Sequence, residues 1–173
     1  MIPSILVEEV DSLAGPDLDD LCDAASDAID AGGGFGWLSA PTRDAFERYW
    51  QGVLVVPERR LFVGRLDGTI AAAAQLIRPP RNNEAQAHQA QLTGAFVAPW
   101  ARGHGLARAL TEAVEAAARD AGFRVLALDV RATQDAAIRL YEGMGFTCWG
   151  TNPCYAWING QYVAGRAYIK ELT

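Results

Sequence analysis

The chain has 173 residues, half of them hydrophobic, and a formal net charge of −6; we therefore expect one globular domain with its own core over residues 1–173. The acidic balance argues against a nucleic-acid partner, and no apolar run approaches the roughly 20 residues of a membrane-spanning helix. No secretory signal opens the sequence and the three cysteines are scattered, so we expect a cytoplasmic protein with no membrane contact, metal site or disulfide framework.

The first half of the chain predicts two helices and four strands. A weakly patterned apolar stretch, Met1 to Val7, is the candidate first strand, and apolar residues at helical spacing then run to the glycines at 32–34, which stop that helix. A second helix is expected from about Thr42. The dipeptide Asp67-Gly68 between two apolar runs predicts a tight hairpin of two strands, and a fourth strand ends before Pro99.

In the second half, a helix is predicted from Gly105, with Gly122 placed to end it. The strand FRVLALDV follows, with Leu126, Leu128 and Val130 on one side and Asp129 on the other, and then a short helix that closes at Gly145. Asn159-Gly160 turns a final hairpin. This order of elements predicts an α/β or α+β domain built around one mixed sheet.

The stretch RGHGLAR, residues 102–108, stands at the start of a predicted helix. Backbone N–H groups there have no partner within the helix, and the helix dipole adds positive charge. Glycines let a bulky anion approach those amides, and the two arginines add charge that a plain turn does not need. The pattern is compatible with either a turn or a phosphate cradle, and it matches neither a P-loop nor a dinucleotide-binding fingerprint.

Two motifs together resemble the GCN5-related N-acetyltransferases (GNAT). Arg102-x-x-Gly105-x-Ala107 after a strand is similar to their acetyl-CoA pyrophosphate loop, and LALDVRATQDAAIRLYEGMGF is similar to their next strand and helix. The resemblance implies a mixed, mostly antiparallel sheet of about six or seven strands with about four helices. It also implies acetyl-CoA as co-substrate, and the two ends of the chain look most like the small-molecule branch that includes tabtoxin-resistance acetyltransferases.

The resemblance assigns the cofactor to one group of residues. Val97, at a strand edge, would hold the pantetheine arm and polarise the acetyl carbonyl, unless it is only a sheet residue. Gln134 stands where the family often has an asparagine that contacts the cofactor. The remaining cofactor-binding candidates supply the pyrophosphate loop: Arg102, Gly103, His104, Gly105, Leu106, Ala107 and Arg108.

Acetyl transfer to an amine needs a base, a stabilised oxyanion and a proton donor for the departing thiolate. Tyr141 is the candidate donor; the alternative is a packed helix aromatic. Asp129 is the candidate base, because an acid in an apolar strand is poorly explained by core stability; the alternative is an ion pair with a neighbour such as Arg131. Gln91 stands where this branch tends to carry a glutamate, and an amide cannot accept the proton, so Asp129 or water would act as base.

The acceptor site is expected between the loop at residues 33–37 and the segment 152–157, with Trp37, Gln91 and Tyr155 as substrate-binding candidates, although core packing explains the aromatic residues almost as well. Every charged side chain before Arg43 is acidic. That half is either a solvated face or the border of a site for a cationic substrate.

The sequence therefore predicts an acetyl-CoA-dependent N-acetyltransferase for the primary amine of a small molecule. Two alternatives are acetylation of a protein N-terminus or lysine, which would need an open groove instead of a pocket closed by the terminal hairpin, and a CoA-binding module without catalysis. The oligomeric state is left open, with a homodimer as one option.

Overall fold

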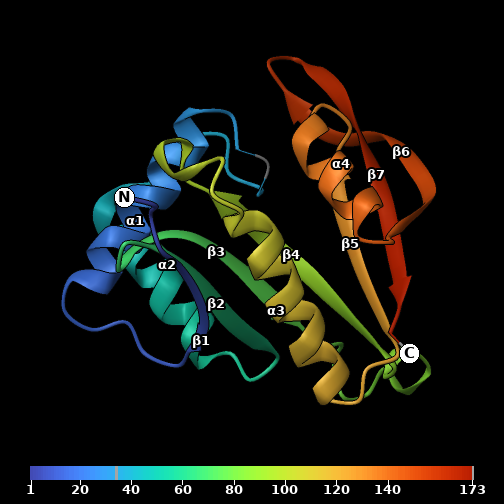
Figure 1. Cartoon of the computed structure of the whole chain (residues 1–173). Coiled ribbons are helices and arrows are strands. Elements are labelled where there is room, and N and C mark those ends of the chain that lie inside the picture. Colours follow the sequence, from blue (N-terminus) through green and yellow to red (C-terminus); the bar gives the residue numbers. More distant parts are fainter. Residues whose placement is uncertain (34, 173) are drawn as a thin grey trace.

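A seven-stranded mixed sheet runs through the computed structural model, which describes residues 1–33 and 35–172, in the order β1-β2-β3-β4-β5-β7-β6 (Figure 1). The strands are β1 (Ile5–Val10), β2 (Arg59–Leu66), β3 (Thr69–Ile77), β4 (Gln89–Val97), β5 (Val125–Arg131), β6 (Thr147–Ile158) and β7 (Gln161–Glu171). The helices are α1 (Pro16–Asp30), α2 (Arg43–Val55), α3 (Leu106–Asp120) and α4 (Asp135–Gly143), with short 3₁₀ turns at Glu84–Gln86 and Pro99–Ala101. In the described ranges, every helix is too short or too polar to span a lipid bilayer. The predicted mixed sheet with four helices is confirmed.

Both predicted hairpin turns are confirmed, and each has the backbone that its residues favour. Asp67 and Gly68 have φ of 50° and 87°, and Asn159 and Gly160 have φ of 53° and 75°. Two successive left-handed residues make the turn whose twist suits a two-residue hairpin, and Asp, Asn and Gly tolerate that conformation best. The first strand lies later than predicted, at Ile5–Val10, because it pairs along β2 and its two glutamates bind arginines there.

Helices cover both faces of the sheet. Successive residues of β2 point to opposite faces: a Cβ added at Gly64 would meet Leu106 and Leu110 of α3, whereas Arg65 binds Asp17 at the start of α1. Helix α3 therefore lies on one face, and α1 packs on the other together with α2 (Figure 1). This double cover explains why β3 is buried along most of its length and β2 in its central residues.

Helix α4 lies on the same face as α3, over β5 and β7. Tyr168 of β7 donates a hydrogen bond of 2.8 Å to Glu142 of α4. Lys170, on the same face of β7, forms an ion pair of 2.6 Å with Glu115 of α3 and donates to the carbonyl of Met144 at 2.7 Å. Polar contacts on this face of the sheet therefore join β7 to both α3 and α4.

The sheet opens between β4 and β5, the only parallel pair among the strands that the structure describes. The two strands pair over three positions, Gln89 to Gln91 with Val125 to Ala127. Beyond them β4 bends at a bulge: the register with β3 shifts between Ala73 and Gln75, and Gly94 has a φ of 63°. A bulge bends its strand and interrupts regular pairing. In the described chain, residues 92–97 of β4 therefore have one edge without a strand partner, and the two strands diverge (Figure 1).

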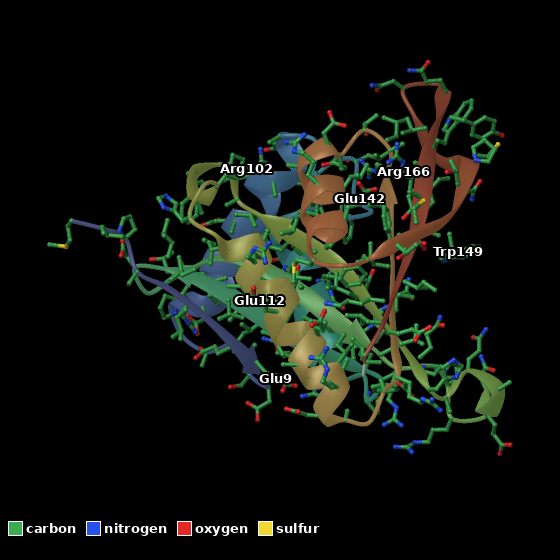
Figure 2. The ribbon with its side chains drawn as sticks, turned by 45° about the vertical axis from the view of Figure 1, so that its right-hand side comes forward. Glu9, Arg102, Glu112, Glu142, Trp149 and Arg166 are labelled. Carbon is green, nitrogen blue, oxygen red and sulfur yellow. The ribbon has the colours of Figure 1, made fainter. Side chains whose placement is uncertain are left out.

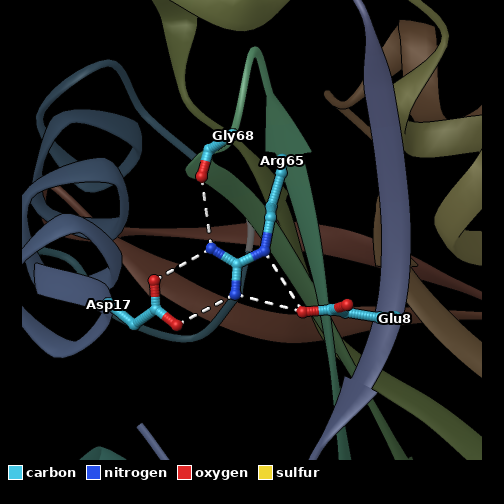
Figure 3. A network of polar contacts seen from close by, with 4 residues as sticks. All are labelled: Glu8, Asp17, Arg65 and Gly68. Carbon is cyan, nitrogen blue, oxygen red and sulfur yellow. Dashed lines mark hydrogen bonds and ion pairs between the residues drawn. The ribbon is translucent and has the colours of Figure 1, made fainter. Parts of the chain in front are cut away.

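A partly buried ion network holds β1 and α1 to β2 (Figure 3). The Arg65 guanidinium donates to both carboxylate oxygens of Asp17 at 2.9 Å, to Glu8 at 3.1 and 3.2 Å, and to the carbonyl of Gly68 at 3.2 Å. The hydrogen bonds from Arg65 lower the pKa of Asp17. Because all its acceptors come from different segments, this one side chain links the N-terminal elements to the sheet.

We predict that Arg65→Met lowers the free energy of unfolding by about 2–3 kcal/mol, because it leaves two carboxylates near a partly buried site without their partner. The lowered pKa of Asp17 stabilises the wild type above the unfolded value near pH 4, and this contribution is lost as the pH falls below it. Urea unfolding from pH 6 to pH 3 should therefore show a weaker acid dependence in the variant. Arg60→Met, which breaks a more exposed ion pair with Glu9, is the control and should lower the free energy of unfolding by less. Equal decreases in the two variants would contradict the prediction.

Candidate active site

The turn before α3 presents a row of free backbone amides. Gly103 and Gly105 have φ of 84° and 83°, and Gly105 is the N-cap of α3. Among the described residues, no backbone carbonyl accepts a hydrogen bond from the amides of residues 103–108. A Cβ added at Gly103 would meet nothing within 4 Å, so the turn is open on that side. Free amides, the helix dipole and absent side chains together form a site suited to an anion.

A cavity of about 560 Å³ begins at this turn and extends between β4 and α4. Arg102 and Arg108 line its outer end, and Figure 2 shows Arg102 at the end of α3 that is nearest to α4. The predicted loop residues Gly103, Gly105, Leu106 and Ala107 also line it, but His104 does not. The group of His104 that agrees with the predicted role is its free backbone amide.

The unpaired edge of β4 forms one wall of the same cavity. Val97 lines it together with Ala95 and Phe96, although Val97 also pairs with Ala72 of β3. Because the opposite edge of β4 has no strand partner beyond Gln91, its backbone donors and acceptors are available to a ligand. Val97 thus has both of its predicted roles, as a sheet residue and as a cavity wall.

A second, polar cavity of about 200 Å³ lies on the other side of α4's first turns. The two cavities have four lining residues in common: Ala95, Gln134, Ala137 and Tyr141. Asp129, Gln91 and Tyr155 line only the second cavity, so three of the predicted residues that are distant in sequence meet there. The two cavities therefore adjoin at the side chain of Tyr141.

Tyr141 is 7% exposed and packs edge-on against Phe146, with ring centroids 5.7 Å apart. Burial raises the pKa of Tyr141 to about 12, so the phenol stays protonated near neutral pH. Within the described chain, its hydroxyl has no hydrogen-bond partner and is not among the buried atoms sealed from solvent. The packed ring and the free hydroxyl are compatible with each other, and the hydroxyl is available to a ligand.

Asp129 points into the second cavity from β5. Partial burial raises the pKa of its carboxyl, which moves it toward the range useful for a base near neutral pH. No hydrogen bond or ion pair joins it to Arg131 in the described residues, so the alternative of a local ion pair is not what the structure shows. Gln91 lies on β4, the strand that pairs with β5, and lines the same cavity as Asp129.

Two other predictions have a different outcome. Trp37 lines neither cavity: it packs edge-on against Phe46 and Tyr49 of α2, with centroids 5.5 and 5.4 Å away. Phe35 and Gly36 of that loop line the second cavity, and Phe35 stacks on Phe96 with ring centroids 4.7 Å apart. Gln134 donates a hydrogen bond of 3.1 Å to the carbonyl of Gly32, so its amide already holds the loop after α1 against α4.

The acidic side chains of the N-terminal half do not line either cavity, although apolar residues and glycines of α1 and the loop after it do. Most of these acidic residues bind arginines instead: Glu8 and Asp17 bind Arg65, Glu9 binds Arg60, and Asp19 and Asp23 bind Arg43. This arrangement agrees with the explanation by a charged, largely solvated face.

Sequence reasoning missed Phe35, Thr93 and Gly94, which line the second cavity. A glycine inside an apolar strand is a signal for a bulge, so Gly94 in QLTGAFV could have been found. Phe35 carried no such signal, because its role depends on where the loop after α1 meets β4.

The chain matches the Acetyltransferase (GNAT) family over residues 21–146. It is 69% identical over 130 residues to an uncharacterized N-acetyltransferase in the hisH-hisA intergenic region of Azospirillum brasilense, covering 75% of this chain and 77% of that protein. An N-acetyltransferase from Staphylococcus aureus Mu50 has the same fold, with a TM-score of 0.82 and 19% identity over 98% of this chain and 99% of that one. The yncA protein of Salmonella typhimurium, solved with its cofactor acetyl-CoA, has a TM-score of 0.77 and 17% identity over 98% and 94% of the two chains.

Proposed function

Because the chain belongs to the Acetyltransferase (GNAT) family and is an N-acetyltransferase, we propose that it moves the acetyl group of acetyl-CoA to the primary amine of a small molecule. The observation that carries this proposal is the meeting of two cavities at Tyr141. One begins at an anion-binding turn and the other contains a carboxylate of raised pKa. The narrower likeness to tabtoxin-resistance acetyltransferases is part of the same proposal.

The larger cavity has the properties that acetyl-CoA requires. The amides of residues 103–108 are free to bind a diphosphate, and Arg102 and Arg108 add positive charge beside them. The unpaired edge of β4 offers backbone groups to an extended amide-containing arm, as an added strand would use them. When bound, acetyl-CoA supplies an acetyl group already activated as a thioester.

The chain's own residues then have separate tasks. Asp129, directly or through water, accepts the proton that the amine loses as its nitrogen bonds to the acetyl carbon. A backbone N–H at the bulge of β4 stabilises the negative charge on the carbonyl oxygen. Tyr141 donates its hydroxyl proton to the sulfur as the carbon–sulfur bond breaks. Asp129 then releases the proton of the amine to solvent, and Tyr141 regains a proton from solvent. The products are an amide and a free thiol.

A small acceptor fits the second cavity better than a protein does. Its volume is about 200 Å³, and Tyr155 of the terminal β6-β7 hairpin forms part of its wall. An extended peptide would need an open groove instead. Gln91 is in this wall as well, where its amide can bind the acceptor but not deprotonate it, which leaves the base role to Asp129 or water.

We predict that Gly105→Val weakens binding of coenzyme A and of inorganic pyrophosphate at least about tenfold, since a branched residue resists a φ of 83° and alters the turn. Isothermal titration calorimetry measures both ligands. The matched control is Gly122→Val at the other end of α3, where φ is 90° and no cavity is near. Equal loss of affinity in both variants would contradict the assignment.

We predict that Tyr141→Phe lowers kcat about a hundredfold or more, because it removes the proton donor for the thiolate, and leaves the affinity for coenzyme A within about twofold. Thiol release with an amine panel measures the first quantity and calorimetry the second. Tyr162→Phe, an exposed position on β7, is the control. An unchanged kcat in Tyr141→Phe would remove its role as acid.

We predict that Asp129→Asn removes the acid limb of the pH profile of kcat/KM. In the wild type, the rate should fall as the pH drops through the raised pKa of Asp129, because the protonated carboxyl cannot act as base. Burial disfavours the ionised carboxyl at neutral pH, so the asparagine variant should be at least as stable as the wild type. A profile that keeps its acid limb in a folded variant would count against Asp129 and favour water.

A further inference from the structure

Arg131, the last residue of β5, is buried without a visible acceptor for its charge. It is 7% exposed, and its side chain forms neither a hydrogen bond nor an ion pair with any described residue. Arg65, the other arginine held well inside the molecule, has two carboxylates and a carbonyl around it. A buried guanidinium that lacks an anion is costly, so the absence of a partner needs an explanation.

The strand geometry places Arg131 on the face of β5 that borders the second cavity, although Arg131 is not among the residues that line the cavity. Residues two apart in a strand point to the same face, so Arg131 lies on the face of β5 that carries Asp129. Their partners on β7 are Gly165 and Ala167, which leave space above the sheet. The ring of Tyr155 occupies part of this space, because a Cβ added at Gly165 would overlap it.

Tyr155 connects Arg131 with the cavity. It lines the cavity together with Asp129, and it is close enough to both charges to respond to them. Burial chiefly raises the pKa of its phenol, Asp129 raises it further, and Arg131 lowers it. A ligand in contact with Tyr155 therefore lies within reach of one negative and one positive group.

The guanidinium also keeps a narrow opening to solvent. Among the described residues, Trp50 has the one side-chain nitrogen that is both sealed from solvent and without a partner. The nitrogens of Arg131, which likewise have no partner, must therefore retain some solvent contact. Asp129 does not fill this opening, since no ion pair joins the two side chains.

We propose that the acceptor carries a carboxylate as well as its amine, and that Arg131 binds the carboxylate while the amine is directed toward Asp129 and Tyr141. This proposal rests on the proposed function. The Cα atoms of Asp129 and Arg131 are two strand residues apart, roughly 6–7 Å, a separation that one amino acid-like molecule can span. A guanidinium binds a carboxylate through two parallel hydrogen bonds.

A carboxylate fits this position better than a phosphate does. One guanidinium neutralises one charge, and a dianion would bring surplus negative charge close to Asp129. The second cavity, at about 200 Å³, has room for a small zwitterion. The substrate class is therefore a small amino acid-like compound, with Arg131 as the residue that selects it.

The test compares matched acceptors. Thiol release is measured for a series of ω-amino acids from glycine to aminohexanoate and for common α-amino acids, each beside its primary amide and its aminophosphonate. The wild type should prefer at least one carboxylate over its amide by about tenfold or more in kcat/KM. In Arg131→Met this preference should disappear, so that the kcat/KM values for the amino acid and for its amide agree within about threefold. Arg131→Lys should keep part of the preference for the carboxylate. The positive charge remains in this variant, but the planar guanidinium that makes two parallel hydrogen bonds is lost.

Arg166→Met is the matched control. Arg166 lies on β7, paired with Val130 next to Arg131 but on the opposite face, where it forms a 4.0 Å ion pair with Glu142 (Figure 2). This variant should keep the wild-type preference. The proposal is overturned if the wild type does not discriminate acid from amide, if it favours the phosphonates, or if Arg131→Met slows both acceptors equally and keeps their ratio.

Stability gives a readout independent of activity. If Arg131 is kept for a ligand, Arg131→Met removes an uncompensated charge and should melt at the same temperature as the wild type or higher; a clear drop would indicate a structural role and overturn the proposal. The amino acids should also raise the Tm of the wild type, without acetyl-CoA, more than their amides do. Because this arm needs no turnover, a failure of catalysis with every amine would refute the proposed function and still leave Arg131 tested.

Discussion

The divergence of β4 from β5 is the constraint on which the rest of the site depends. Three paired positions hold the strands together, and the bulge at Gly94 then turns β4 away. A sheet normally satisfies its backbone groups strand by strand. Here the next six residues of β4 have a free edge, and the space that opens beside it becomes the larger cavity.

The two cavities have contrasting chemistry because they lie on opposite sides of this opening. One ends at the N-terminus of α3, where free amides and arginines favour negative charge. The other is walled by Asp129 and Tyr155 on the face of β5 turned away from α4. Tyr141 reaches both because α4 closes the gap between the strands, and its burial keeps the phenol protonated.

The charged residues that form ion pairs differ in position from those that have no charged partner. Most acidic side chains of the N-terminal half bind Arg43, Arg60 or Arg65, and none of them lines either cavity. Among the described residues, Asp129 and Arg131 have no such partners. An unpaired charge near a cavity slightly destabilises the protein without ligand. A bound ligand of opposite charge offsets this free-energy cost.

The sequence by itself determined the features that depend on local backbone preference. The turn at residues 102–108, the hairpins at Asp67-Gly68 and Asn159-Gly160, and the alternation that points Asp129 away from the core were all predicted, because glycine tolerance, helix capping and strand periodicity act over a few residues. The tertiary structure alone decided which distant segments meet. It placed Phe35 and not Trp37 in the cavity wall, tied Gln134 to Gly32, and left Arg131 without a partner among the described residues. These outcomes depend on how a loop and a strand edge pack across the opened sheet, which no short-range pattern encodes.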